Sequence, residues 1–265
     1  MSTNDFAVTG GSGQAPDHRE RAAIIQAALL PPSALTPPRL HALIPAAGAG
    51  TRFGGELPKQ YQRLGRATML EHATAALLAD ARVVSVLVVV LPGDPHVAGL
   101  AFDARVQTAA VGGATRAASV RAGLEVLRER LSDDDWVLVH DAARPCLAAD
   151  ELAVQIDTLQ ADAVGGLLAV PLADTLKRAE GERVAATLDR AGLWRAATPQ
   201  MFRLGLLRAA LDAPGRLAQA TDEASAVEQL GHAPRLVAGR ATNIKVTTAD
   251  DLPLARAILG LQGRL

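Results

Sequence analysis

The chain has 265 residues, of which 49% are hydrophobic, and its formal net charge at pH 7 is −1. This length fits one domain or at most two, and the apolar fraction is large enough to fill a sizeable core. Acidic and basic residues nearly balance, so no global basic field favours nucleic acid or an anionic membrane surface as a partner. The single cysteine, Cys146, excludes an intrachain disulfide and a cysteine-rich zinc site, and it fits a reducing cytoplasm.

Residues 1–40 differ in composition from the rest of the chain. They begin rich in Gly and Ser, and proline pairs at 31–32 and 37–38 then bracket a short Ala-rich segment. This composition is typical of a loose extension, although a misassigned start codon would produce the same tail. We predict a disordered extension over 1–40 and a single domain over 41–265. The extension has no segment long enough to span a bilayer and no basic region of a secretion signal.

In the predicted domain, continuous apolar runs alternate with helical patterns. The runs lack the polar alternation of half-exposed strands, which indicates strands covered on both faces. They occupy residues 40–46, 83–91, 105–111, 136–140 and 163–170. Between them, residues 68–80 and 115–131 repeat apolar side chains at spacings of three and four, as amphipathic helices do. The pattern predicts an α/β fold, with a Rossmann-like, three-layer arrangement around a mostly parallel sheet.

A glycine-rich stretch follows the first run and matches two known phosphate-binding loops only in part. A Walker A loop has Gly directly before its Lys and Ser or Thr directly after it, and neither condition is met at Lys59. The dinucleotide-binding pattern begins at Gly48 and Gly50, but Phe53 stands at the third glycine position. The second apolar run also ends without an acidic residue for a ribose, which disfavours hydride chemistry.

Two cations in the same stretch favour a nucleotide site. A turn without bulky side chains lets backbone N–H groups approach an anion. Arg52 and Lys59 lie seven residues apart in this loop, so a guanidinium and an ammonium can converge on one polyphosphate. A simple strand-to-helix turn is the alternative interpretation of the glycines.

Further polar residues follow the later runs, where the carboxyl ends of parallel strands gather ligands. They include Gly113, Arg116 and Ser119, then His140, Asp141 and Arg144, and finally Lys245 beside a short strand expected at 243–246. Asp141 is either a capping or turn residue or a Mg²⁺ ligand, since Mg²⁺ bound with phosphates takes one or two protein carboxylates. His140 is interpreted as a packed strand-end residue, and Cys146 has no evident histidine to activate it.

Seven motifs together resemble the 2-C-methyl-D-erythritol 4-phosphate cytidylyltransferase family, from about residue 41 to the C-terminus. In chain order they are PAAGAGTRFGGELPKQY, GGATRAASVRAGL, WVLVHDAARPCL, PLADTLKR, LDRAGLWRAATPQMF, TDEASAVE and GRATNIKVT. HDAARP, ATPQ with TDEAS, and NIKVT are far more specific than a glycine-rich loop. Ala114 and Thr242 depart from the pattern, because an acidic residue often occupies these positions in the family.

The resemblance implies a fold of the nucleotide-diphospho-sugar transferase type and a defined reaction. CMP would pass from CTP to 2-C-methyl-D-erythritol 4-phosphate, giving 4-(cytidine 5'-diphospho)-2-C-methyl-D-erythritol and pyrophosphate for isoprenoid precursors. The acceptor phosphate would attack the α-phosphorus in line, with Arg52, Lys59 and Mg²⁺ stabilising the developing charge. A phosphomonoester carries roughly −1.5 to −2 charge at pH 7, so it needs little help from a general base.

The resemblance also assigns roles to residues of this chain. The catalytic groups would be Arg52, Lys59, Arg190 and Lys245. The nucleotide would be bound by Pro45, Ala46, Ala47, Gly48, Gly50, Gly113, Arg116, Ser119 and Ala142. The acceptor would be bound by Thr175, Arg190, Thr198, Thr221 and Lys245, and Asp141 would hold Mg²⁺.

Residues 173–200 contain strand-like pieces and polar turns without a long apolar stripe, which predicts an exposed excursion. In the resembled family this segment is a β-arm that contacts a second subunit. We therefore expect a homodimer, with Arg190 acting across the interface. A ribitol phosphate cytidylyltransferase and a catalytically silent nucleotide-binding protein on the same scaffold are the alternative functions.

Overall fold

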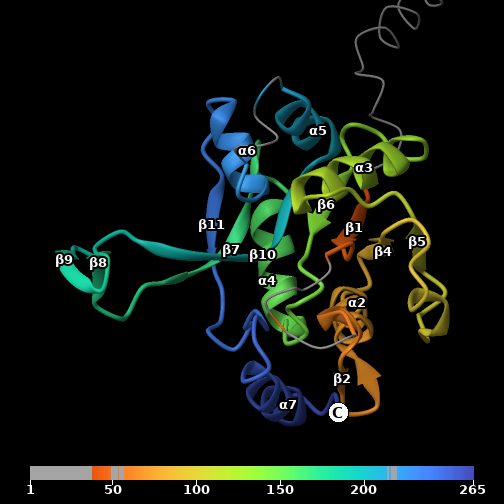
Figure 1. Cartoon of the computed structure of the whole chain (residues 1–265). Helices are drawn as coiled ribbons and strands as arrows, with labels where there is room; N and C mark the ends of the chain where they lie inside the picture. The colour runs from red at the N-terminus through yellow and green to blue at the C-terminus, as the bar shows by residue number, and fades with distance from the viewer. Residues whose placement is uncertain (1–37, 49–52, 54–56, 214, 216–219) are drawn as a thin grey trace, which may run out of the picture. The chain divides into compact units, whose positions relative to one another are not determined.

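A seven-stranded sheet forms the centre of the structure, which is a computed structural model describing residues 38–48, 53, 57–213, 215 and 220–265. The strand order is β11-β7-β10-β6-β1-β4-β5 (Figure 1). Residues Pro38–Leu265 form one compact unit. The predicted extension over 1–40 lies outside the described residues except at 38–40, and Leu40 already belongs to β1. The strands are β1 (Leu40–Pro45), β4 (Val83–Val89), β5 (Val106–Ala109), β6 (Trp136–Val139), β7 (Gly165–Pro171), β10 (Trp194–Arg203) and β11 (Arg235–Ala238).

The sheet is mostly parallel, as the sequence predicted. Neighbouring strands run parallel throughout, except that β10 runs antiparallel to both β6 and β7. The five predicted runs all contain a strand of this sheet. The prediction was wrong for residues 197–200, which are buried in β10, whereas residues 194–196 of the same strand are exposed. This strand was missed because Thr198 and Gln200 are polar, yet both are buried and hydrogen bonded.

Helices cover both faces of the sheet, which confirms the three-layer α/β architecture. They are α2 (Met69–Leu77), α3 (Arg116–Arg128), α4 (Ala149–Leu159), α5 (Leu204–Asp212), α6 (Glu223–Gln229) and α7 (Asp251–Leu261). Two single-turn 3-10 helices, η1 (Lys59–Tyr61) and η2 (Val97–Gly99), and a small ribbon of β2 (Arg63–Leu64) and β3 (Ala67–Thr68) complete this part. The predicted helices correspond to α2 and α3. None of the described helices is both long enough and apolar enough to cross a membrane.

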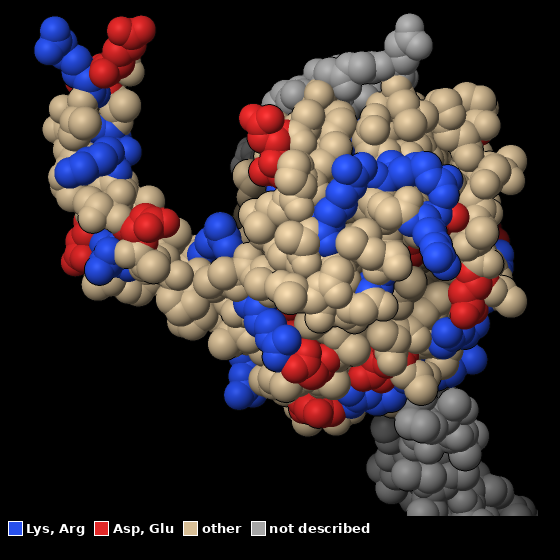
Figure 2. Space-filling model, turned by 90° about the horizontal axis from the view of Figure 1, so that it is seen from below, with Lys and Arg blue, Asp and Glu red and all other residues tan. Residues whose placement is uncertain are grey.

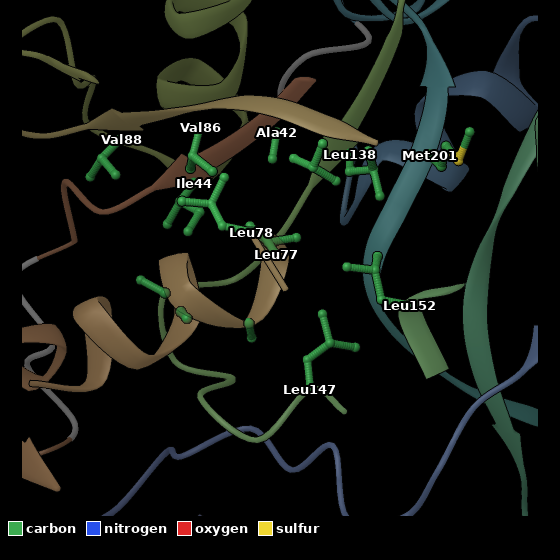
Figure 3. Packing of buried hydrophobic residues seen from close by; sticks show 14 of the residues in the cluster. Ala42, Ile44, Leu77, Leu78, Val86, Val88, Leu138, Leu147, Leu152 and Met201 are labelled. Atoms are coloured by element: carbon green, nitrogen blue, oxygen red, sulfur yellow. The ribbon is translucent and has the colours of Figure 1, made fainter. Parts of the chain in front are cut away.

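Successive residues of one strand supply the cores on the two faces. Ala42 and Ile44 of β1 join a cluster with Leu77 of α2 and Leu152 of α4, part of which Figure 3 shows. Leu43, which lies between them in sequence, points to the other face and joins a cluster with α3, α5 and α6. Because side chains alternate across a strand, only a continuous apolar run fills both cores.

Local hydrogen bonds fix where the predicted helices begin. Thr68 caps α2 in a capping box, since its Oγ1 accepts from Glu71 N while Glu71 Oε2 accepts from Thr68 N. Thr115 caps α3, because its Oγ1 accepts a hydrogen bond from Ala118 N at 3.1 Å. This hydrogen bond sets Arg116 as the first residue of α3.

A two-stranded hairpin, formed by β8 (Leu176–Glu180) and β9 (Arg183–Leu188), projects from the sheet (Figure 1). It corresponds to the predicted β-arm, although it is shorter than the predicted range of 173–200. Figure 2 shows acidic and basic side chains mixed along it. A second difference concerns residues 243–246, which have no regular secondary structure where a short strand was expected.

Candidate functional site

A cleft of about 480 Å³ opens where β1 and β6 end. Its walls come from four segments that are far apart in the sequence: the turn after β1 with η1, the loop before α3, the turn after β6, and residues near the C-terminus. This is the edge at which parallel sheets bind ligands. The predicted residues that line it are Pro45, Ala46, Ala47, Gly48, Lys59, Gly113, Arg116, Ser119, Asp141, Ala142 and Lys245.

Asp141 lies directly after β6 and forms ion pairs with two cations of the cleft. Its Oδ1 accepts a hydrogen bond from Arg116 Nε at 2.9 Å, and its Oδ2 lies 2.7 Å from Lys245 Nζ. Burial by itself would raise the pKa of Asp141, but the charges of Arg116 and Lys245 outweigh it and hold this pKa well below its usual range. The carboxylate is therefore ionised at neutral pH although it is only 7% exposed.

Glu223 extends this network from the first turn of α6. Its carboxylate accepts two hydrogen bonds from the Arg116 guanidinium, at 2.6 and 2.9 Å. Burial opposes the charge of Arg116, but Glu223 and Asp141 together raise its pKa above the ordinary value. Arg116 thus bridges two buried carboxylates. Sequence analysis gave Glu223 no role, although the acidic pair in the TDEAS motif was a signal for it.

Lys245 is held in place without the expected strand. Val246, on its C-terminal side, is fully buried, and its N–H donates to Ala143 O at 2.8 Å. Asn243 O accepts from Arg144 Nη1 at 2.7 Å, and Asn243 Nδ2 donates to the carbonyl of Thr198 at 2.9 Å. These contacts fix the segment on both sides of Lys245, so its ammonium faces Asp141.

The loop before α3 requires glycine because it packs closely on the turn after β1 at Gly112 and on the first turn of α3 at Gly113. A Cβ on Gly112 would lie 2.3 Å from Ala47 Cβ, and a Cβ on Gly113 would lie 2.7 Å from Ala118 Cβ. Ser119 reaches back from α3, where its Oγ accepts a hydrogen bond from Gly113 N at 3.1 Å. The backbone of this loop therefore forms a fixed wall of the cleft.

Lys59 and Gln60 enter the cleft from η1. Lys59 Nζ donates to Val246 O at 3.4 Å, so this lysine contacts the segment that carries Lys245. Gln60 is buried, and its side-chain amide donates to two carbonyls of the turn after β1. Sequence analysis did not assign Gln60 a role. Its position next to Lys59 was the only sequence signal.

A buried hydrogen-bond network supports Asp141 from behind. Thr198 Oγ1 accepts from Asp141 N at 3.0 Å and lies 2.9 Å from His140 Nδ1. Nε2 of His140 lies 3.0 Å from the carbonyl of Arg144. Burial lowers the pKa of His140 to about 4, so the imidazole is neutral. His140 is therefore a packed strand-end residue, as predicted, and Thr198 acts on the backbone of Asp141 instead of lining the cleft.

The remaining predicted residues lie elsewhere. Thr221 lines a second cavity of about 250 Å³, which borders the cleft at Arg116. Thr175 and Arg190 are exposed near the hairpin and do not line the cleft, and Arg190 donates a hydrogen bond to Ala173 O. Gly50 and Arg52 lie outside the described residues.

Asp141 is suited to hold Mg²⁺ as a single protein carboxylate. Both of its oxygens contact cations, but an ionised carboxylate has about four lone-pair positions and can accept further ligands. Mg²⁺ bound together with phosphates takes one or two carboxylates and keeps several waters. Among the described residues no three His, Cys, Asp or Glu side chains converge on one point. A metal bound here would therefore take most of its ligands from phosphates and water.

Comparisons with known proteins agree on one family. The sequence model of 2-C-methyl-D-erythritol 4-phosphate cytidylyltransferase matches residues 40–261. The protein of that name from Laribacter hongkongensis is 57% identical over 226 residues, which cover 84% of this chain and 97% of the relative. The protein of the same name from Dechloromonas aromatica is 51% identical, covering 84% and 98%.

Solved structures agree with the sequence comparison. A crystal structure of 4-diphosphocytidyl-2C-methyl-D-erythritol synthase has a TM-score of 0.76 and 44% identity, covering 83% of this chain and 99% of that one. The 2-C-methyl-D-erythritol 4-phosphate cytidylyltransferase of Francisella tularensis has a TM-score of 0.73 and 35% identity, covering 83% and 100%.

Proposed function

This chain belongs to the 2-C-methyl-D-erythritol 4-phosphate cytidylyltransferase family, and on that premise we propose how its cleft carries out the reaction of the family. The protein is a nucleotidyltransferase of the non-mevalonate isoprenoid pathway. It transfers CMP from CTP to 2-C-methyl-D-erythritol 4-phosphate and forms 4-(cytidine 5'-diphospho)-2-C-methyl-D-erythritol and pyrophosphate.

One observation carries the proposed mechanism: the ionised Asp141 lies between Arg116 and Lys245, in the cleft that Lys59 also lines. The reaction brings two anions together, and the transition state spreads charge over the phosphate oxygens. Fixed cations can neutralise this phosphate charge, and a carboxylate among them can bind a metal together with the phosphates. CTP lies in the cleft against the turn after β1 and the loop before α3.

The acceptor phosphate is the nucleophile and attacks the α-phosphorus in line. Lys59 and Arg52 stabilise the negative charge that develops on the phosphates of CTP. Lys245 binds the acceptor phosphate, because its side chain is 41% exposed. Its ammonium can leave the carboxylate of Asp141 and pair with a phosphate oxygen instead. Mg²⁺ bound with the nucleotide supplies further neutralisation of phosphate charge, and Asp141 is the residue that would hold it.

The rest of the acceptor lies in the neighbouring cavity in this proposal. Thr221 lines it together with Arg116 and Glu223, so a hydroxyl group can be bound next to the charge network. Thr198 supports the same region indirectly, through its hydrogen bond with the backbone of Asp141. The polyol part of the acceptor would therefore lie on the side of the cleft that faces α6.

The hairpin completes the site of a second copy in a homodimer. Its exposed apolar side chains include Val184 at 64% and Leu188 at 41%, and Trp194, at the start of β10, is 38% exposed. An isolated two-stranded ribbon is only marginally stable, and this one exposes apolar side chains. A second copy of the chain would cover this apolar surface. Thr175 and Arg190 do not line the cleft of their own chain, so in the dimer they act on the acceptor in the cleft of the partner. The proposed compartment is the cytoplasm, where CTP is available and a single thiol stays reduced.

Pyrophosphate release from CTP and Mg²⁺ tests the proposed function. The purified chain is assayed in parallel with methylerythritol phosphate and with ribitol 5-phosphate. We expect release with methylerythritol phosphate alone. Release with ribitol 5-phosphate alone would overturn the acceptor, and no release with either would favour a catalytically silent nucleotide-binding protein.

A further inference from the structure

The turn after β1 is fixed by a side chain that follows it in the sequence. Gln60 is 4% exposed, and its Nε2 donates to Ala46 O at 2.8 Å and to Gly48 O at 3.1 Å. A primary amide nitrogen has two hydrogens, so both donors of Gln60 are used. Both acceptors belong to residues that line the cleft.

A third hydrogen bond connects the same turn to the sheet. Ala46 N donates to Val89 O, the last residue of β4, at 2.7 Å. That bond fixes the start of the turn, whereas Gln60 fixes both its start and Gly48. Glycine-rich backbone has many accessible conformations, so it needs such restraints to present a constant surface to a ligand.

The segment that carries Gln60 is itself anchored. Tyr61 is 3% exposed, its hydroxyl donates to Asp94 Oδ2 at 2.7 Å, and its ring packs 5.0 Å from the ring of His96. Lys59 is the residue before Gln60 in η1, and it lines the cleft. A displacement of Gln60 therefore moves the backbone of Lys59 as well as the turn.

We propose that Gln60 is a positioning residue for the nucleotide, which sets the spacing between the turn at Ala46–Gly48 and Lys59. This inference rests on the proposed function of the cleft. The two walls that it joins both belong to the nucleotide half of the site. Lys245 and Thr221, which bind the acceptor, lie on segments that Gln60 does not contact through these bonds. Gln60 thus acts directly on the walls that hold CTP, whereas the acceptor side is one contact further away, where Lys59 Nζ donates to Val246 O.

Gln60→Met tests this role, because methionine keeps the length of the side chain and removes both donors. Loss of two hydrogen bonds should raise KM for CTP about 10-fold, and displacement of Lys59 should lower kcat. KM for the acceptor should stay within about twofold. Gln60→Glu should have the larger effect, because a carboxylate cannot donate and repels the two carbonyl oxygens.

Gln155→Met is the matched control. Gln155 in α4 is fully buried, and its Nε2 donates to the carbonyl of Pro199 at 2.7 Å, but it does not line the cleft. We expect Gln155→Met to lower the unfolding temperature without raising KM for CTP. Equal rises of KM for CTP and for the acceptor in Gln60→Met would indicate a general structural effect and overturn the proposal.

Calorimetric titration with CTP and Mg²⁺ separates this inference from the proposed function. A wild-type chain that binds CTP but turns over neither acceptor would contradict the function, and the Kd of CTP would still test Gln60. A Kd that both Gln60 variants leave within about twofold of wild type would contradict the positioning role.

Discussion

The ammonium of Lys245 lies 2.7 Å from Oδ2 of Asp141 and joins the end of β6 to a segment near the C-terminus. That segment has no regular secondary structure, and buried Val246 and Asn243 hold it in place. Asp141 is nearly buried, whereas the side chain of Lys245 is 41% exposed. The pair therefore has one fixed member and one that can reach a ligand.

Lys245→Ala should weaken binding of the acceptor more than binding of CTP. The variant removes the cation that we place on the acceptor phosphate, while Arg116 still neutralises Asp141. Steady-state kinetics should show a rise in KM for methylerythritol phosphate that exceeds the rise for CTP. Equal changes in both KM values would remove this assignment.

Lys59→Ala should act mainly on turnover. Loss of one preorganised donor to a charged transition state typically lowers kcat by roughly 10²-fold or more. Arg128→Ala is a suitable control, because Arg128 lies at the end of α3, outside the cleft, where it pairs with the partly exposed Glu125. Turnover of Lys59→Ala close to wild type would contradict the role of this lysine.

Glu223→Ala should destabilise the protein through Arg116. The change leaves the guanidinium with Asp141 as its one remaining partner among the described residues. Breaking a buried ion pair costs about 3 to 5 kcal/mol in the free energy of unfolding. Denaturant unfolding measures this loss. Glu125→Ala is the comparison, because Glu125 pairs with Arg208 and Arg128 at a more exposed position and should cost about 1 kcal/mol or less. A similar loss of unfolding free energy in both variants would show that the pair of Glu223 with Arg116 stabilises the fold no more than a surface ion pair does.

His140 should make stability depend on pH in a mildly acidic window. Burial lowers its pKa to about 4 in the folded state, whereas an unfolded histidine has a pKa of about 6.5. Between these values the unfolded state binds more protons. The contribution of His140 is therefore complete above about pH 6.5 and is lost as the pH falls towards 4, by up to about 3 kcal/mol.

Unfolding of wild type and His140→Gln, compared across this window, isolates the contribution. Buried His41 and His72 also have lowered pKa values and remain in both proteins, so they cancel in the difference. We expect a shallower fall of the unfolding free energy in His140→Gln. Identical slopes would show that His140 does not titrate as its burial implies.

The homodimer can be tested at the hairpin. Val184→Asp places a charge on its exposed apolar side and should shift the sedimentation mass from two chains towards one. Val154→Asp is the control, because Val154 is 54% exposed on α4, away from the hairpin. A wild-type mass equal to one chain would contradict the dimer.

Apolar patterning was sufficient to predict five strands of the sheet and the site edge, but it missed the parallel strand β11, which is mostly exposed. Most residues of β1 and β4 are buried on both faces of the sheet, so both strands are mostly apolar in sequence. Asp141 was found because it follows such a run. β10 was not predicted, because buried Thr198 and Gln200 depend on hydrogen-bond partners in other segments.

Residues whose roles depend on distant contacts could not be predicted from local patterns. Glu223 meets Arg116 across 107 positions of the chain, and no periodicity encodes such a pair. Gln60 is close to its acceptors in sequence, but its role depends on the path of an irregular turn. Helix and strand patterns carry no information about that path.

Pyrophosphate release by Asp141→Asn, with CTP, Mg²⁺ and methylerythritol phosphate, tests the central claim most directly. Asparagine keeps the shape of the side chain and removes the charge that holds Lys245 and that would hold the metal. Arg116 keeps Glu223 as a partner, and an unfolding curve verifies that the variant is folded. We predict a loss of turnover of roughly 10²-fold or more. Turnover within about twofold of wild type in a folded variant would contradict the account.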